Sequence, residues 1–214
     1  MQTLNLSDGR NGNEPIWLWL AVLLILTLSG ISPEADRLTW LLETLPVMIG
    51  LLLLAVTRSS FPLTLLTYRL LTLHALVLIL GGYYTYAEVP LFNYLRDSLE
   101  LSRNHYDRVG HFVQGFVPAI LAREILIRRS PLTRGPWLFF LTVCFCLAFS
   151  AFYELIEWWV ALANDEAAQS FLGTQGDPWD TQTDMFLALV GAISSLIMLS
   201  RPHDRLLNQL KQGS

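Results

Sequence analysis

The chain has 214 residues, of which 53% are hydrophobic and only 15% are charged. A soluble domain carries about 25% charged residues, so the low charge excludes an ordinary soluble domain. The apolar excess excludes a disordered tail and a small disulfide scaffold. Fourteen basic residues against eighteen acidic ones leave a formal net charge of −4. That balance provides no electrostatic attraction for phosphate backbones, and we expect no nucleic acid among the partners.

Six apolar segments predict membrane spans. A bilayer core about 30 Å thick needs about 20 mostly apolar residues in a helix. The six segments are close to that length or longer, and few charges interrupt them. In chain order they cover residues 15–33, 38–57, 70–87, 106–127, 137–163 and 178–200. The sequence therefore predicts an all-α, polytopic membrane helix bundle of about six transmembrane helices over residues 15–200, with the lipid bilayer around it.

Short polar segments flank this membrane domain. Residues 1–14 are predicted to form a flexible cytoplasmic tail, and residues 201–214 a short cytoplasmic tail. Lys and Arg in short loops stay on the cytoplasmic side, and ten of the fourteen basic residues lie on the inner side if both termini are inside. The first span is interpreted as uncleaved, because its polar leader carries Asp8 and Glu14 and no signal-peptidase motif follows. These features predict a multi-pass protein with both termini cytoplasmic.

Ionisable side chains gather in the last three spans. Such groups are costly inside a membrane and mark functional sites by default. The candidates are Asp107 and His111 in the fourth span, Glu154 and Glu157 in the fifth, and Asp180 and Asp184 in the sixth. The i,i+4 spacing of the first pair places both side chains on one helix face. Because short connections join these spans, we expect the candidates to converge in the outer leaflet.

Simpler interpretations exist for single members of this set. Asp180 falls in the first turn of its predicted helix, where a negative charge favours the helix dipole. Glu157 precedes Trp158 and Trp159, which are typical of a membrane interface. His111 on its own would be an ordinary core histidine. A functional role therefore depends on convergence of the whole set.

Two kinds of chemistry suit one imidazole among several carboxylates. The set can hold a divalent metal ion, with His111, Glu154 and Asp184 as candidate ligands, or it can act in general acid–base catalysis. Either favours hydrolysis or group transfer on a lipid-linked or envelope substrate. Two alternatives stay open, a small transporter or channel and a structural or regulatory membrane subunit whose polar cluster only holds helices together.

Small and charged residues elsewhere in these spans predict packing contacts. Gly115 thins the fourth span, and Gly191 with Ser195 forms a small-xxx-small spacing in the sixth, which is typical of close helix packing. Arg123 and Glu124 lie at the inner end of the fourth span, where an Arg side chain can reach the interface.

Three polar strings carry a resemblance to a known family. They are H-Y-D-R-V-G-H-F-V-Q-G-F (105–116), F-Y-E-L-I-E-W-W (152–159) and L-G-T-Q-G-D-P-W-D-T-Q-T-D-M-F-L-A-L-V-G-A (172–192). The chain resembles the YjdF-type family of bacterial inner-membrane proteins, whose function is unknown. This resemblance implies a multi-helix protein of the bacterial inner membrane and supplies no reaction.

A looser resemblance is to VanZ-like membrane proteins. Asp107 and His111 match their D-x-x-x-H element, and Glu154 or Glu157 matches their later membrane Glu. Their D-x-x-x-N-x-x-G element is matched only in part, since its Asn is replaced here. VanZ-like proteins are associated with resistance to glycopeptide antibiotics at the cell envelope. By analogy, the resemblance implies an envelope or lipid-linked substrate.

Overall fold

The computed structural model describes residues 12–163 and 174–212, and within these ranges the regular structure is helical throughout. Six helices are long and apolar enough to cross a membrane. They are α1 (Glu14–Ile31), α2 (Arg37–Thr57), α3 (Leu65–Tyr84), α5 (Tyr106–Arg129), α6 (Pro136–Ala163) and α8 (Asp180–Gln212). A short 3-10 turn, η1 (Tyr86–Glu88), and a short helix, α4 (Pro90–Ser98), lie between α3 and α5. The predicted all-α membrane bundle is confirmed.

The helix limits differ from the predicted spans at two places. Helix α3 begins at Leu65 rather than at residue 70, because Thr64 caps it and its hydroxyl accepts from the backbone N–H of Thr67. Helix α8 runs on through Pro202 to Gln212, so most of the segment predicted as a C-terminal tail is helical. Buried Leu207 anchors this extension. Of the predicted N-terminal tail, residues 1–11 lie outside the described residues.

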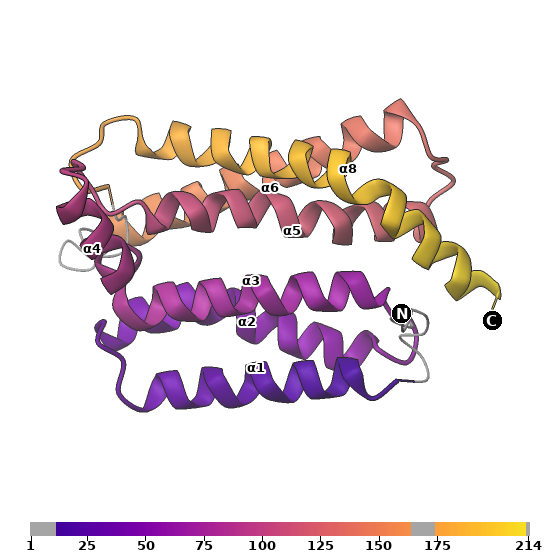
Figure 1. The fold of residues 1–214 in the computed structure, drawn as a ribbon, viewed down its shortest axis with the longest axis horizontal. Coiled ribbons are helices and arrows are strands. Elements are labelled where there is room, and N and C mark those ends of the chain that lie inside the picture. The colour runs from indigo at the N-terminus through magenta and orange to yellow at the C-terminus, as the bar shows by residue number, and fades with distance from the viewer. Residues whose placement is uncertain (1–11, 164–173, 213–214) are drawn as a thin grey trace.

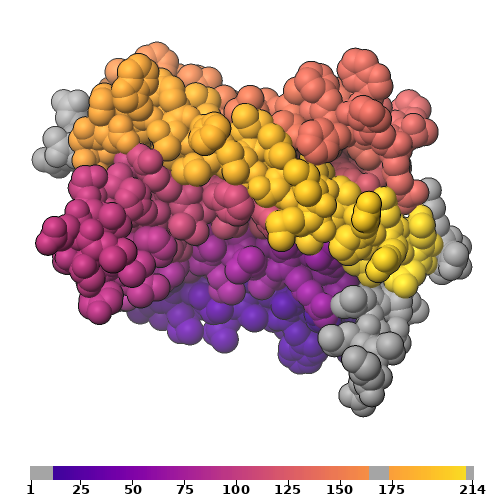
Figure 2. Space-filling model, turned by 45° about the horizontal axis from the view of Figure 1, so that its top comes forward, coloured from indigo at the N-terminus to yellow at the C-terminus, as the bar shows by residue number. Residues whose placement is uncertain are grey.

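The helices form two groups of three (Figure 1). Helices α1, α2 and α3 pack together, as do α5, α6 and α8, and the two groups meet mainly where α3 contacts α5. Helix α1 begins, and α8 ends, at the same end of the bundle, here called the termini end. Helix α4 lies at the opposite end, here called the α4 end. Figure 2 shows α8 crossing the visible face obliquely between these two ends.

The apolar side chains divide between two small cores and the outer surface. One core joins α1, α2 and α3 and the other joins α5, α6 and α8. Large apolar residues also point outward, among them Trp17, Leu24, Leu52 and Ile197, which are 60–72% exposed. An apolar exterior is favourable in a lipid bilayer, where it contacts acyl chains.

Helices α5 and α8 cross with their backbones in close contact. A Cβ atom placed on Gly115 would overlap the carbonyl group of Ala188, and one on Gly191 would overlap the carbonyl group of Phe112. Glycine is therefore required on both sides of the crossing. The close packing predicted from these small residues is confirmed.

This contact predicts the outcome of a pair of alanine substitutions. Gly115→Ala forces the backbones of α5 and α8 apart, and we expect it to lower the free energy of unfolding by about 1–3 kcal/mol. Gly50→Ala is the matched control, because a Cβ on Gly50 meets nothing within 4 Å. Since alanine favours helix over glycine, the control should be neutral or stabilised by up to about 1 kcal/mol. Thermal unfolding in detergent measures both, and equal melting temperatures would contradict the crossing.

Candidate functional site

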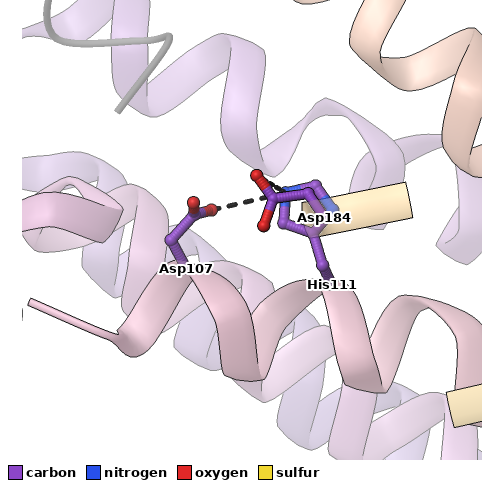
Figure 3. A group of neighbouring side chains, drawn as sticks. All are labelled: Asp107, His111 and Asp184. Carbon is purple, nitrogen blue, oxygen red and sulfur yellow. Dashed lines mark ion pairs between the residues drawn. The ribbon is translucent and has the colours of Figure 1, made fainter. Parts of the chain in front are cut away.

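His111 is the centre of a buried polar group near the α4 end. It lies one helical turn after Asp107 on α5, and Asp184 approaches its ring from α8 (Figure 3). The Nε2 atom of His111 is 3.4 Å from an Asp107 carboxylate oxygen and 3.9 Å from one of Asp184. All three side chains are buried. The convergence of the fourth and sixth spans is therefore present in the structure.

The other side of the imidazole faces α6. The Nδ1 atom of His111 is 3.8 Å from a carboxylate oxygen of Glu154, which is also buried. Candidate ligand atoms lie within 4.8 Å of one another in two sets, one formed by Asp107, His111 and Asp184 and the other by His111, Glu154 and Glu157. Asp184 and Glu154 therefore belong to different sets, although both were predicted as ligands of one metal ion. We call these five residues the His111 group.

Several polar atoms of the His111 group have no hydrogen-bond partner among the described residues. They are Nδ1 of His111, Oε1 of Glu154 and Oδ1 of Asp184. A buried polar atom without a partner costs about 1–3 kcal/mol, and more if the group is charged. Such atoms are rare in folded proteins, and here they occur on three neighbouring side chains.

Asp180 belongs to a separate cluster with two arginines. It pairs with Arg103, which precedes α5 and also lies 3.4 Å from Asp107. Arg108 pairs with Asp177, just ahead of α8. The backbone N–H of Trp179 and then the Arg108 guanidinium hold the pKa of Asp177 below its ordinary value. Asp180 was predicted to join the catalytic candidates, but its contacts are with arginines at the edge of the His111 group.

The two arginines are site residues that sequence reasoning missed. Neither is among the site candidates predicted from the sequence, although the i,i+4 spacing of Arg103 and Asp107 is a signal for an ion pair. A buried asparagine positions this segment. The Asn104 side chain donates to the Val89 carbonyl and to the Asn93 side chain, and its oxygen accepts from the N–H of Tyr106. It thereby fixes the start of α5 against α4.

A second buried cluster lies toward the termini end, around Glu124 of α5. One carboxylate oxygen accepts from the Thr64 N–H at 2.9 Å and from Arg128 at 2.7 Å. The other accepts from the hydroxyls of Thr64 and Thr67 at 2.9 and 2.7 Å. Nε2 of His203, on α8, lies 3.1 Å from the same oxygen. Glu124 therefore caps the N-terminus of α3 from a neighbouring helix and joins three helices.

Arg123 completes this cluster and fixes the tautomer of its histidine. Its guanidinium lies 3.1 Å from Nδ1 of His203 and pairs with Asp204 at 2.8 Å. Because a guanidinium only donates, Nδ1 of His203 accepts, and Nε2 carries the hydrogen that is donated to Glu124. Arg123 is buried and its guanidinium lies among these polar groups, so it packs between α5 and α8; its reach to the membrane interface stays a prediction. We call the residues around Glu124 the Glu124 network.

Residues 15–205 match the family model described as "Predicted membrane protein (DUF2238)". The protein is thus an integral membrane protein with six candidate spanning helices, and it belongs to this family. It is 53% identical over 190 residues to "Inner membrane protein YjdF" of Escherichia coli (strain K12), covering 89% of this chain and 90% of the relative. No solved structure matches the chain. The resemblance to the YjdF-type family is confirmed, while that to VanZ-like proteins stays a prediction.

The Glu124 network predicts a large structural effect of one substitution. Glu124→Ala removes the cap of α3 and leaves His203 and Arg128 without their shared acceptor. We expect it to lower the free energy of unfolding by about 3 kcal/mol or more. Glu14→Gln is the control, because Glu14 pairs with Arg69 at the surface, where both side chains are over 40% exposed and an ion pair contributes less than about 1 kcal/mol. Thermal or denaturant unfolding in detergent distinguishes the two, and a mild effect of Glu124→Ala would contradict the network.

Proposed function

We propose that the protein is a metal-dependent hydrolase or transferase of the bacterial inner membrane. Asp107, His111 and Asp184 would bind a divalent metal ion, and the substrate would be a lipid-linked or envelope molecule. The observation that carries this proposal is the set of unpartnered buried atoms in the His111 group.

The contrast between the two buried clusters supports a ligand rather than a structural role. In the Glu124 network both carboxylate oxygens accept hydrogen bonds and both His203 nitrogens have partners. A cluster that only joins helices has this closed form, since the bilayer supplies no water to satisfy its atoms. The His111 group has the same kinds of residues but leaves atoms of His111, Glu154 and Asp184 open. An ion bound at Nε2 of His111 would engage the Asp184 carboxylate, and it would leave the hydrogen of the ring on Nδ1, which faces Oε1 of Glu154.

The donor set suits a divalent cation in an open coordination sphere. An imidazole nitrogen and carboxylate oxygens bind Zn²⁺ or Mn²⁺. Three protein ligands leave a further position for water or substrate, as in catalytic rather than structural sites. Glu154 faces the other imidazole nitrogen, where a carboxylate commonly orients a metal-bound histidine. Glu157 next to it remains a candidate general acid or base.

The charge balance of the site also favours a cation. Besides the four carboxylates of the His111 group, buried Glu43 on α2 lies within electrostatic range of Asp107 and has an unpartnered oxygen. Arg103 offsets part of the charge on Asp107. Several carboxylates are left with one imidazole between them, and such an arrangement is unfavourable in a membrane without a cation or protons.

The proposal includes a location and an orientation. The basic residues favour both termini in the cytoplasm, which puts the α4 end and the His111 group on the outer side of the membrane. The E. coli relative is named as an inner-membrane protein. A site in the outer leaflet favours substrates that carry a lipid or belong to the envelope.

Metal analysis of purified variants tests the proposal. We expect wild-type protein to bind Zn²⁺ or Mn²⁺, and Asp184→Asn or His111→Ala to lose that binding. Glu154→Gln, which alters the orienting carboxylate, should weaken it by about 10–100-fold. Asp97→Asn, an exposed acid on α4 paired with Arg96, is the control and should bind as wild type does. Elemental analysis and metal titration give the measurements.

A stability comparison separates this function from a structural role. In metal-free protein, Asp184→Asn removes a buried carboxylate with an unpartnered oxygen, so the variant should be at least as stable as wild type. A structural network would be destabilised by the same change. Equal metal binding by wild type and Asp184→Asn, or a large loss of stability in the metal-free variant, would refute the metal site.

A further inference from the structure

We propose that Arg108, together with Arg103, binds a phosphate group carried by a membrane amphiphile, and that Asp177 occupies this anion position in the absence of ligand. This inference rests on the proposed function, since it names the substrate class of the same site. It comes from the arrangement of the arginine cluster at the edge of the His111 group.

One carboxylate oxygen of Asp177 lies between the two guanidinium groups. It pairs with Arg108 at 2.5 Å and lies 3.6 Å from Arg103. An anionic oxygen is therefore already present where two guanidinium groups converge. Guanidinium groups bind phosphate oxygens with paired, charge-assisted hydrogen bonds, so a phosphate matches this position chemically.

The two arginines differ in how firmly they are held. The Arg103 side chain is only 4% exposed and is fixed by Asp107 and Asp180. The Arg108 and Asp177 side chains are 25% and 26% exposed, so their ion pair is only partly buried. Solvent reaches such a pair and screens it, so it is held less firmly than a fully buried one. A ligand phosphate can therefore displace Asp177 from Arg108 while Arg103 stays in place.

The anion position is directly linked to the proposed metal site. Arg103 contacts one oxygen of Asp107, and the other oxygen of Asp107 faces His111. A phosphate held by the arginines therefore lies beside the residues that would bind the metal ion. Metal sites that act on phosphate esters combine a cation with such positively charged side chains.

The same end of the molecule presents an apolar surface. Helix α4 and the residues after it expose Leu91, Tyr94 and Leu99 by 63–68%. Asn104 ties α4 to the start of α5, next to Arg103. A short amphipathic helix with such a face lies at a membrane interface, at the level of lipid head groups. This placement favours a phosphate attached to alkyl chains over free phosphate.

Binding measurements on the full-length protein in phosphatidylcholine nanodiscs test the proposal. The probes are short-chain phosphatidic acid, inorganic phosphate, and short-chain phosphatidylcholine as the comparison lipid. We expect wild type to bind phosphatidic acid more tightly than either other probe, and Arg108→Gln to weaken that binding at least about tenfold. Arg96→Gln is the matched control, because Arg96 lies at the same end and pairs with Asp97 on α4. It should bind phosphatidic acid as wild type does.

A second variant is expected to change the affinity for phosphatidic acid in the opposite direction. Asp177→Asn removes the internal competitor while its side-chain oxygen still accepts from the Trp179 N–H, so phosphatidic acid should bind several-fold more tightly. A merely structural ion pair would not produce tighter binding. Unchanged binding in a folded Arg108→Gln variant, or no tightening in Asp177→Asn, would overturn the proposal. If wild type bound inorganic phosphate as tightly as phosphatidic acid, the inference that the phosphate belongs to a lipid would be refuted.

The metal content of the same samples keeps the two proposals apart. If the arginine and aspartate variants behave as expected but the protein holds no metal ion, the phosphate site stands and the metal-dependent function fails. If metal binds and Arg108→Gln leaves phosphatidic acid binding unchanged, the metal site stands and the phosphate site fails.

Discussion

The structure depends on the cost of polar groups in a bilayer, because every such group must find its partner inside the protein. Helix α5 concentrates this problem, with Asp107 and His111 at one end and Arg123 and Glu124 near the other. Its neighbours provide the answer. Helices α3, α6 and α8 pack around α5. Helix α6 contributes polar side chains to the His111 group, the start of α3 contributes polar groups to the Glu124 network, and α8 contributes to both. The outer helices α1 and α2 mainly bury apolar surface against α3.

The two clusters solve the same problem to different degrees. Around Glu124, donors and acceptors are matched across α3, α5 and α8, so the network contributes to holding the two groups of helices together. Around His111, the acids outnumber the bases and three side chains keep unpartnered atoms. A membrane protein that keeps such a group must be stabilised by interactions in another part of its fold. The Glu124 network is one such set of stabilising interactions. The helices are thus joined by a fully hydrogen-bonded network near the termini end, while the His111 group at the α4 end keeps unpartnered atoms.

The sequence was sufficient to predict the six helices and to name all five residues of the His111 group as candidates, because both follow from local patterns. Long apolar segments indicate membrane spans. An acid one turn before a histidine, as in Asp107 and His111, indicates that both side chains lie on the same face of a helix. It was not sufficient for contacts that depend on how helices cross. His203 lies 79 positions from Glu124 and was assigned to a tail, since Pro202 and the polar residues around it resemble the end of a span. Arg103 and Arg108 lie about 70 positions or more from Asp177 and Asp180, so only the packing of α5 against α8 revealed their pairing.

The crossing of α5 and α8 explains how the His111 group keeps its geometry without a complete hydrogen-bond network. Gly115 lies one turn after His111, and Ala188 lies one turn after Asp184, and these two residues meet backbone to backbone. A contact between backbones allows little sliding or rotation, because neither side has a flexible side chain to adjust. The separation of His111 and Asp184 is therefore set by the rigid part of the fold rather than by mutual hydrogen bonds. Such a group can keep open acceptor atoms in a fixed arrangement, which is what preorganised binding of a ligand requires.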